Sequence, residues 1–382
     1  MRKVAVFTGS RAEYGLLARL MGLLRDAPEV QLQVIAGAMH FAPEFGQTWR
    51  GIVADGFAID AQVEMLLASD TPVGVVKSLG LGTIGMADAL ARLDPDLLVI
   101  LGDRFEALAA AQAALIMGIP IAHIHGGEIS EGAYDDAIRH AITKMATLHF
   151  VAAEPYRQRV IQMGTPPDRV FTVGAPGLDG LREGVMPLAE VSASLDFAIR
   201  PPFVLATYHP VTSGHEDPGA GIAECLAGLD AVPDVQVIFT YPNADNGGRA
   251  IIAAIEAWVA GNRTRAVAVP SLGTARYRAV MAAAAASLGN SSSGIIEAPG
   301  FRVPTVNVGI RQRGRLAAAS VRHVAADRGA VVAGLHWALS DAGRSVAATA
   351  INPYGQGNAA QSIFAGLTGP LPDGLPFHVL EA

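Results

Sequence analysis

The sequence predicts an α/β protein with two doubly wound lobes, each built around a parallel sheet. Short apolar runs rich in Val, Ile and Leu alternate with longer stretches of helical periodicity, in two series along the 382 residues. Continuous apolar runs are typical of strands buried on both faces, as in parallel sheets whose crossovers are helices. A segment rich in Pro and Gly, 174–202, separates the two series, and we expect it to act as a hinge.

The first series defines an N-terminal lobe, which we expect to span residues 1–178. Its expected strands and helices follow one another in the order of a repeated strand–helix–strand unit. The strands are Val4–Phe7, Leu32–Ala36, Leu97–Leu101, Ile119–Ile124, His149–Ala152 and Val170–Val173, and the helices include Tyr14–Asp26, Arg104–Met117 and Asp135–Ala146.

The second series defines a C-terminal lobe at 179–355. Two sheets of this kind would bind a ligand at the carboxyl ends of their strands, in a central cleft. A last helix near Ala359–Leu367 belongs to the segment 356–382, which we expect to pack back on the N-terminal lobe. The expected strands are Phe203–Tyr208, Val235–Tyr241, Ala266–Val269 and Pro304–Val308, and the helices are Gly219–Ala231, Arg249–Ala260 and Ala275–Ala286.

Composition excludes several classes of partner. The net charge of −7 and the lack of a basic tract argue against nucleic acid. The Ala-rich run 279–288 is too short to cross a bilayer, and the start of the chain lacks the long apolar region of a signal peptide. We therefore expect a cytoplasmic protein with no membrane partner. The single cysteine, Cys225, excludes an internal disulfide and is expected to be a small buried apolar residue.

Ionisable residues follow three strands of the N-terminal lobe. The loop after the first strand lacks the G-x-G-x-x-G spacing, which disfavours a dinucleotide cofactor, and its Arg11 either contacts a phosphate or is solvated. Asp103 follows the strand 97–101, where it could point to the ligand or cap the next helix, and the two roles can coexist. These two positions are the first candidates for a site.

The segment 123–140 holds the densest group of ionisable side chains. Glu128, Asp135 and one of the histidines His123 and His125 could supply a general acid and base. In a plainer interpretation, Asp135 caps a helix, with Arg139 and His140 partly solvated. A metal site formed by His123, His125 and Glu128 is disfavoured because no further ligand cluster is evident. We expect no metal.

The C-terminal lobe carries a predicted anion site. The turn Gly289–Gly294 is small, polar and bounded by glycines, and it leads into an expected helix that contains Glu297. Such a turn presents backbone N–H groups and hydroxyls to an anion, while a carboxylate can accept hydrogen bonds from a sugar. His209, at the end of strand 203–208, and Asn243, in Tyr241–Asp245, follow neighbouring strands, and Arg311 and Arg315 follow the strand 304–308. The combination suggests a nucleoside diphosphate.

Ten stretches, in order and spread over nearly the whole chain, are similar to those of the hydrolysing UDP-N-acetylglucosamine 2-epimerase family. The similarity is to its bacterial branch, which acts in sialic-acid and related nonulosonic-acid pathways. One stretch alone would be a weak signal, whereas ten in order are specific. They are TGSRAEYG (8–15), GDRFEAL (102–108), HIHGGE (123–128), DDAIRHAITK (135–144), VGAPGLD (173–179), TYHPVT (207–212), YPN (241–243), GNSSSGIIEAP (289–299), RQRGR (311–315) and NPYGQGNA (352–359).

The resemblance implies the two-lobed GT-B fold and a reaction without redox cofactor or metal. In that reaction a base removes the proton at sugar carbon 2, UDP leaves anti to it, and water adds to the resulting 2-acetamidoglucal to give free N-acetylmannosamine. The family's members are usually homodimers or homotetramers. By position, Asp103 and Asp135 match catalytic carboxylates and His209 the histidine near the leaving phosphate. Ser291 and Ser292, beside Asn290, match pyrophosphate contacts, Glu297 the ribose ligand, and Arg11, Asn243 and Arg311 other nucleotide contacts.

One departure leaves the acid–base assignment open. Several relatives carry a catalytic glutamate where this chain has His125, so that either Glu128 takes over its role or His125 itself acts. Four alternatives also stay open at this point. The substrate could be UDP-2,4-diacetamido-trideoxyglucose or a GDP sugar, the product could remain bound to UDP, or the protein could bind nucleotide sugars without turnover. A glycosyltransferase is disfavoured because we find no acceptor segment.

Overall fold

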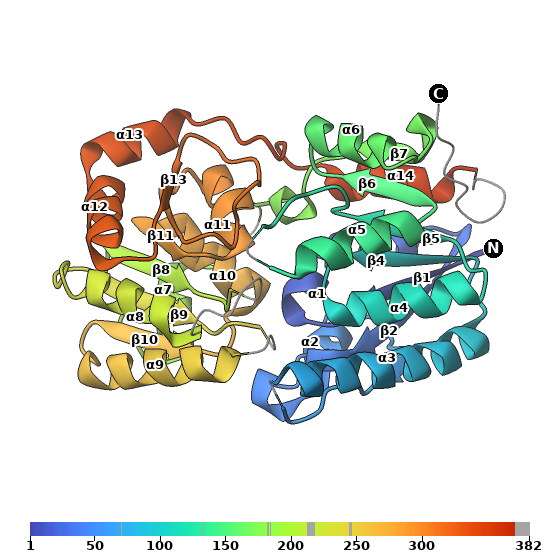
Figure 1. The fold of residues 1–382 in the computed structure, drawn as a ribbon, viewed down its shortest axis with the longest axis horizontal. Helices are drawn as coiled ribbons and strands as arrows, with labels where there is room; N and C mark the ends of the chain where they lie inside the picture. The colour runs from blue at the N-terminus through green and yellow to red at the C-terminus, as the bar shows by residue number, and fades with distance from the viewer. Residues whose placement is uncertain are drawn as a thin grey trace. The chain divides into compact units, whose positions relative to one another are not determined.

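The computed structural model describes residues 1–69, 71–131, 133–181, 183, 185–211, 218–243 and 247–370. The chain forms two parallel sheets, each covered by helices on both faces, which confirms the predicted α/β class with two doubly wound lobes (Figure 1). Thr212, the last residue of the motif TYHPVT, Ala244 and Asp245, which follow the motif YPN, and residues 371–382 of the tail lie outside the described residues.

The first sheet has seven strands in the order β3-β2-β1-β4-β5-β6-β7, and all neighbours are parallel. The strand order reverses between β1 and β4, which is the switch point where open α/β sheets bind ligands. The strands are β1 (Arg2–Thr8), β2 (Val30–Gly37), β3 (Ala61–Val63), β4 (Leu97–Leu101), β5 (Ile121–Ile124), β6 (Leu148–Val151) and β7 (Val170–Thr172). The helices are α1 (Arg11–Asp26), α2 (Trp49–Ala54), α3 (Pro72–Leu93), α4 (Phe105–Ile116), α5 (Asp135–Met145), α6 (Glu154–Gln162) and α14 (Ala359–Thr368).

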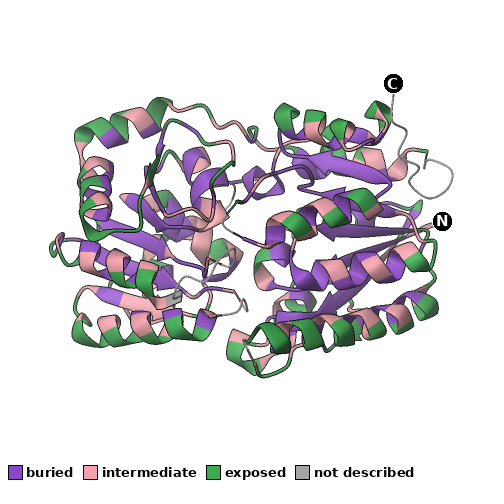
Figure 2. Cartoon of the chain, viewed as in Figure 1, coloured by how far each residue is buried: buried purple, intermediate pink, exposed green. Residues whose placement is uncertain are grey.

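Strand β4 shows why this sheet is buried on both faces. Leu97, Val99 and Leu101 pack into a core with α1 and α14, whereas Leu98 and Ile100 point to the other face and pack with α3, α4 and α5. Since side chains alternate along a strand, a continuous apolar run supplies both cores at once. The central strands are accordingly buried, whereas the edge strand β7 exposes Phe171, and the helices expose their outer faces (Figure 2).

The second sheet has six parallel strands in the order β10-β9-β8-β11-β12-β13, with its switch point between β8 and β11. Helices α8, α9 and α12 cover one face, where the predicted buried position of Cys225 is confirmed, and α7 and α10 cover the other. The strands are β8 (Phe203–Thr207), β9 (Gln236–Thr240), β10 (Ala266–Val269), β11 (Ala286–Gly289), β12 (Thr305–Val308) and β13 (Val321–Val324). The helices are α7 (Leu188–Leu195), α8 (Pro218–Leu229), α9 (Gly248–Gly261), α10 (Gly273–Ala283), α11 (Ser292–Ile296), α12 (Arg328–Leu339) and α13 (Asp341–Thr349).

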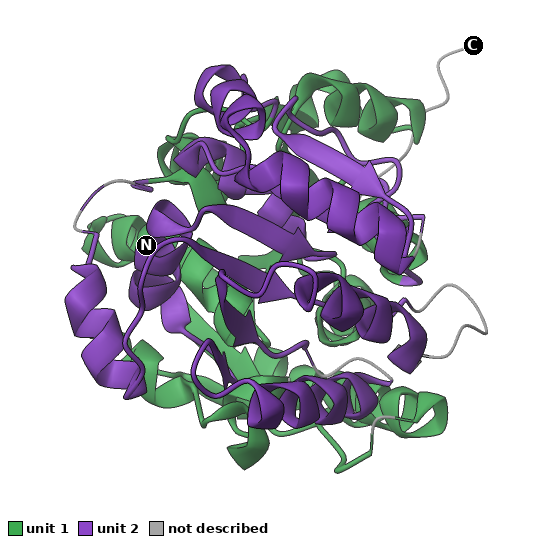
Figure 3. Ribbon diagram, turned by 90° about the vertical axis from the view of Figure 1, so that its left-hand side faces the viewer, with its two compact units in different colours: residues 1–128, 135–179, 354–382 green, residues 129–134, 180–353 purple. Residues whose placement is uncertain are grey.

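Two compact units divide the chain (Figure 3). Unit 1 comprises Met1–Glu128, Asp135–Asp179 and Tyr354–Ala382, and unit 2 comprises Ile129–Tyr134 and Gly180–Pro353. The chain therefore enters unit 2 briefly after Glu128, between β5 and α5, before it returns to unit 1.

Helix α14 belongs to unit 1 although it lies near the end of the chain. Its residues Ala360, Ile363 and Leu367 are buried in the core beneath α1. The Asp179 carboxylate accepts hydrogen bonds from the backbone N–H groups of Asn358, Ala359 and Ala360, at 2.6, 2.8 and 2.6 Å. The motif residue Asp179 thus caps α14.

Helix α3 alone among the described helices is long and apolar enough, by length and composition, to cross a membrane. One third of its apolar window is buried inside the protein, and its inner side packs on α4. The outer side exposes Val73, Val76 and Ile84.

Candidate functional site

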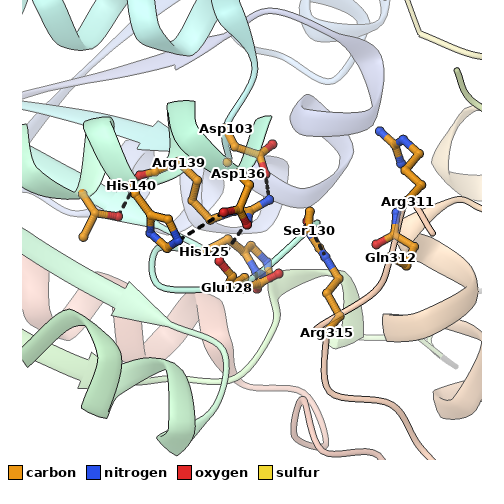
Figure 4. A network of polar contacts seen from close by, with 12 residues as sticks. Asp103, His125, Glu128, Ser130, Asp136, Arg139, His140, Arg311, Gln312 and Arg315 are labelled. Carbon is orange, nitrogen blue, oxygen red and sulfur yellow. Dashed lines mark hydrogen bonds and ion pairs between the residues drawn. The ribbon is translucent and has the colours of Figure 1, made fainter. Parts of the chain in front are cut away.

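Arg139 organises a polar cluster in unit 1, where β4 and β5 end (Figure 4). Its guanidinium is 1% exposed and forms an ion pair with Asp103. It also donates to the Asp136 carboxylate at 3.2 Å and to the Glu128 backbone carbonyl at 2.9 Å. The planar fork of an arginine can hold several acceptors in one fixed geometry, so Arg139 locks these three residues together.

Asp103 reaches this cluster from the loop after β4. The preceding Gly102 has a φ of +83°, a left-handed conformation that glycine adopts without strain. Arg104, not Asp103, occupies the N-cap position of α4 and makes no side-chain cap hydrogen bond. The Asp103 carboxylate forms an ion pair with Arg139, and this contact directs it toward the polar cluster.

The two histidines near the end of β5 have different environments. His123 is fully buried, with Nε2 at 2.7 Å from the Gly102 carbonyl and Nδ1 at 3.3 Å from Thr143 Oγ1. Burial lowers the pKa of His123 to about 4, so that it is neutral at physiological pH and serves the structure. His125 has a φ of +68°, and its Nδ1 lies 2.5 Å from Glu128 Oε1.

The start of α5 carries the remaining acidic groups. Asp135 is the first residue of the helix and is 9% exposed. Asp136 Oδ2 lies 3.5 Å from His140 Nε2, which keeps 28% of its side chain exposed. Arg139 is far from solvated, so the plainer interpretation is wrong for that residue. Among the described residues, no group of three or more His, Cys, Asp or Glu side chains is arranged to hold a metal ion.

Glu13, Arg104 and Glu106 form a second buried cluster in unit 1. Arg104 Nε lies 2.6 Å from Glu106 Oε1 and 3.9 Å from Glu13 Oε1, while Gly9 N–H donates to Glu13 Oε2 at 2.7 Å. Two buried carboxylates thus share one guanidinium. Burial first, and then the nearby Glu106, raise the pKa of Glu13 to about 8. The cluster ties the loop that precedes Arg11 to the loop that contains Asp103.

Asn290 holds together the candidate anion site of unit 2. Its side-chain oxygen accepts from His209 N–H at 2.6 Å, and its amide donates to the His209 carbonyl at 2.8 Å. Its own carbonyl accepts from Arg311 Nη1 at 3.2 Å and from Gln312 Nε2 at 2.9 Å. Asn290 is fully buried and therefore positions the His209 and Arg311 loops. The backbone N–H of Asn243 lies 3.4 Å from His209 Nδ1.

The serine turn begins the short helix α11. Ser291 is its N-cap and accepts from the Ser293 N–H, while Ser292 is its first residue. The Tyr277 hydroxyl lies 2.5 Å from Ser293 Oγ, which braces the turn from α10. Glu297 is the C-cap of this helix. Burial raises the pKa of Glu297 to about 7, although the positive charge of Arg278 acts to lower it.

Two further arginines of the sequence prediction lie elsewhere. Arg11 is the first residue of α1 in unit 1 and is half-buried. Arg315 donates to Ser130 Oγ at 3.2 Å within unit 2.

A cavity of about 1070 Å³ opens beside Arg315, where β8, β12 and β13 end. Polar groups in its wall include Tyr208, Glu224, Arg313, Arg315, His323 and Asp327.

Sequence reasoning missed three contributors to these sites. Arg139 was considered only as a solvated residue, although its place in a motif with Asp136 one helical turn before it was a signal. Gln312, which is 2% exposed and bound to Asn290, was not considered at all. The Glu13–Arg104–Glu106 cluster joins residues far apart in sequence, so only the fold reveals it.

Comparison with protein families shows which family the chain matches. The family described as UDP-N-acetylglucosamine 2-epimerase matches residues 23–368.

The chain belongs to this family.

Its curated relatives cover most of both chains. It is 37% identical over 316 residues to the "GDP/UDP-N,N'-diacetylbacillosamine 2-epimerase (hydrolyzing)" of Campylobacter jejuni, which covers 82% of each chain. It is 34% identical over 341 residues to the "UDP-N,N'-diacetylbacillosamine 2-epimerase (hydrolyzing)" of Legionella pneumophila, which covers 89% of each. The resemblance inferred from the ten motifs is thereby confirmed.

Solved structures of the family share the fold. A UDP-GlcNAc 2-epimerase from Neisseria meningitidis, solved with bound UDP-GlcNAc, matches with a TM-score of 0.79 at 18% identity, over 96% of this chain and 99% of that one. A Staphylococcus aureus MnaA–UDP structure matches with a TM-score of 0.78 at 16% identity, over 96% of each chain. The two-lobed GT-B fold that the resemblance implied is therefore confirmed.

Proposed function

We propose that the protein is a hydrolysing 2-epimerase that converts a UDP-activated 2-acetamido sugar into UDP and the free, 2-epimerised sugar. UDP-N-acetylglucosamine, which would give free N-acetylmannosamine, and UDP-N,N'-diacetylbacillosamine are the candidate substrates. The observation that carries this proposal is the buried cluster of Asp103, His125, Glu128 and Arg139 in a chain of a 2-epimerase family. The names of the relatives at 37% and 34% identity support the hydrolysing outcome.

The chemistry requires proton transfer at sugar carbon 2 and the departure of a diphosphate. Unit 1 supplies the groups that exchange protons, among them Asp103, Asp135 and the His125–Glu128 pair. Inversion at carbon 2 requires that the proton leave one face of the sugar and return to the other, so more than one such group takes part. A general acid or base of this kind typically contributes about 10²- to 10⁴-fold to a rate.

Unit 2 supplies the groups that stabilise the leaving nucleotide. His209 and Arg311 donate to the diphosphate together with the hydroxyls of Ser291 and Ser292, because donors aimed at developing negative charge lower the barrier most. Glu297 accepts from the ribose hydroxyls. Asn243 of this unit and Arg11 of unit 1 are the further nucleotide contacts of the proposal. Asn290 holds the His209 and Arg311 loops in register.

The test incubates the purified protein in deuterated water with UDP-N-acetylglucosamine, UDP-N,N'-diacetylbacillosamine and the GDP counterpart of each. The protein is first dialysed against EDTA and no cofactor is added, since the proposed reaction needs neither metal nor redox group. We expect UDP release together with a free sugar that carries deuterium at carbon 2. Release of no nucleotide from any donor would refute the function, and a product still linked to UDP would indicate the non-hydrolysing reaction.

A further inference from the structure

His125 and Glu128 form a pair whose geometry differs from that of the neighbouring histidine. Both ring nitrogens of His123 lie against internal partners, the Gly102 carbonyl and the Thr143 hydroxyl, which accounts for that residue structurally. His125 instead directs Nδ1 to the Glu128 carboxylate at 2.5 Å. Of the two histidines that the sequence offered, the hydrogen bonds leave His125 as the one suited to chemistry.

The backbone of His125 is held in a costly conformation. Its φ of +68° is left-handed, which costs a residue other than glycine on the order of 1–3 kcal/mol. The strand would otherwise continue and place His125 on the same face as His123, inside the protein. The left-handed turn therefore separates the two imidazoles. Strain of this kind persists at functional sites, where surrounding contacts enforce it.

Glu128 sets the tautomer of His125. An ionised carboxylate is an acceptor only, so the short contact requires a proton on Nδ1, and Nε2 of the neutral ring then carries the lone pair. Glu128 cannot easily shift, since its side chain is 1% exposed and its carbonyl accepts from Arg139. The imidazole keeps 11% of its side chain exposed. A rigid buried carboxylate behind a partly exposed imidazole is the arrangement by which enzymes orient a histidine base.

We propose that His125 Nε2 is the base that removes the proton from carbon 2 of the sugar, with Glu128 as its positioning residue. This assignment rests on the proposed function. The lone pair of Nε2 takes the proton, the electrons of the C2–H bond form the C1=C2 bond, and the C1–O bond breaks with its electron pair leaving on UDP. Water then adds its oxygen to carbon 1, and carbon 2 receives a proton from the opposite face.

Charged and titratable groups from the neighbouring elements belong to the same cluster as this pair. Asp103 comes from the loop after β4, Arg139 from α5 and His123 from β5, while Glu128 follows in the same loop. The Asp103 carboxylate forms an ion pair with Arg139. His125, with 11% of its side chain exposed, is the nitrogen base that we assign within this cluster.

The test compares His125→Asn and His125→Glu with wild type. Asparagine tolerates the left-handed backbone and removes the base, so kcat for UDP release should fall by about 10²- to 10⁴-fold while UDP affinity stays within about twofold. In His125→Glu the glutamate restores a basic group, so activity should partly return. The acid limb of this variant's pH profile should lie at lower pH, because carboxylates lose their proton at lower pH than imidazoles. His336→Gln, on the exposed face of α12, is the control for loss of a histidine.

Glu128→Gln tests the positioning role. An amide can still meet the ring but no longer stabilises the protonated imidazole, so kcat should fall while KM changes little and the acid limb of the pH profile moves to lower pH. If the wild type is active and His125→Asn has the same kcat and the same acid limb, the assignment of His125 is overturned. The proposed function would still stand. Lack of turnover by the wild type itself would instead refute the proposed function. Retained UDP binding and a cooperative thermal transition show that each variant is folded.

Discussion

Arg139 shows how a single buried cation can determine the shape of a site. A guanidinium that is 1% exposed must satisfy its donors inside the protein, and it does so with Asp103, Asp136 and the Glu128 carbonyl. Since these partners come from the loop after β4, from α5 and from the loop after β5, one side chain fixes three separate parts of the chain relative to one another. The position of Asp103 is thus a property of Arg139 as much as of its own loop.

Replacing Arg139 by Lys should lower kcat on the order of 100-fold, because the charge remains but a single ammonium cannot hold three acceptors in the fork geometry. UDP affinity should stay unchanged, since Arg139 is not among the residues that we propose to contact the nucleotide. Steady-state kinetics and calorimetry measure the two quantities. The exposed Arg263→Lys is the matched control, and an unchanged kcat in Arg139→Lys would contradict this role.

Glu297 makes a prediction about pH and nucleotide affinity. Its pKa is raised to about 7 by burial, so the carboxylate that we propose as acceptor for the ribose hydroxyls is present above that pH and is lost below it. UDP affinity should therefore fall as the pH is lowered from 8 to 6. Calorimetry on Glu297→Gln isolates this effect from the titration of UDP itself, because the variant should bind more weakly at pH 8 and lose this part of the pH dependence. Parallel curves for both proteins would exclude Glu297 as the cause.

Among the elements, the first turns of α1 and α4 are joined by Glu13, Arg104 and Glu106. A Cβ at Gly9 would come within 2.4 Å of Glu106 Cγ, so the loop approaches the cluster as closely as glycine permits. Burial, and then the nearby Glu106 carboxylate, explain why Glu13 retains a proton near neutral pH. The elements that carry Arg11 and Asp103 are consequently held by a group that titrates.

Glu13→Gln should change how stability depends on pH. The folded protein keeps the Glu13 proton up to about pH 8, whereas the unfolded chain releases it near the usual value of 4.5. The folded state binds more protons in this window, so Glu13 lowers the free energy of unfolding as the pH rises from about 5 to 8. The variant, which cannot ionise, should gain stability relative to wild type over this range. Urea unfolding at several pH values measures the difference, and a constant difference would refute it.

The cap of α14 offers a second test at the level of elements. Asp179→Ala removes the acceptor of three backbone N–H groups that are partly or fully buried, which should cost about 1–3 kcal/mol in the free energy of unfolding. Amide hydrogen exchange at 358–360 should speed up as well. Asp327→Ala is a matched control, because Asp327 caps α12 with one bond at an exposed helix end, where the loss should be smaller. Equal losses would contradict the argument.

At the scale of the whole molecule, the two sheets repeat one plan, with a strand order that reverses beside the first strand of each unit. The family resemblance predicts a homodimer or homotetramer, and α3 exposes Val73, Val76 and Ile84, at 64%, 66% and 65%, on one outer face. Apolar faces of this kind often mark contacts between proteins. We expect α3 to take part in the assembly.

Val76→Glu should weaken that assembly, because an unpaired charge buried at an interface costs about 1–3 kcal/mol, or on the order of 10- to 100-fold in the dissociation constant. Light scattering over a dilution series measures the mass. Val53→Glu, at an exposed valine of α2, is the control and should leave the mass unchanged. A wild-type protein that is monomeric throughout would refute the expected assembly.

Most strands could be predicted because buried parallel strands are short apolar runs, as in Leu97–Leu101. Strand β11 (Ala286–Gly289) was missed, since its Ala–Ser–Leu–Gly sequence continues an Ala-rich helical pattern and has little β propensity. Strand β13 (Val321–Val324) was missed too, because its two central residues are polar and only its first is fully buried. Pairing with β12 decides that this segment is a strand.

For the candidate site, the residues that follow each strand could be predicted from the sequence, but the contacts between them could not. The spacing of carboxylates and histidines after β4 and β5 follows from the local pattern, and the fold class follows from periodicity. Three facts needed the tertiary structure. Arg139 forms an ion pair with Asp103, a left-handed backbone conformation at His125 separates it from His123, and Asn290 holds His209 by hydrogen bonds. Local pattern determines secondary structure, whereas contacts between residues far apart depend on how helices and strands pack, which no short window of sequence contains.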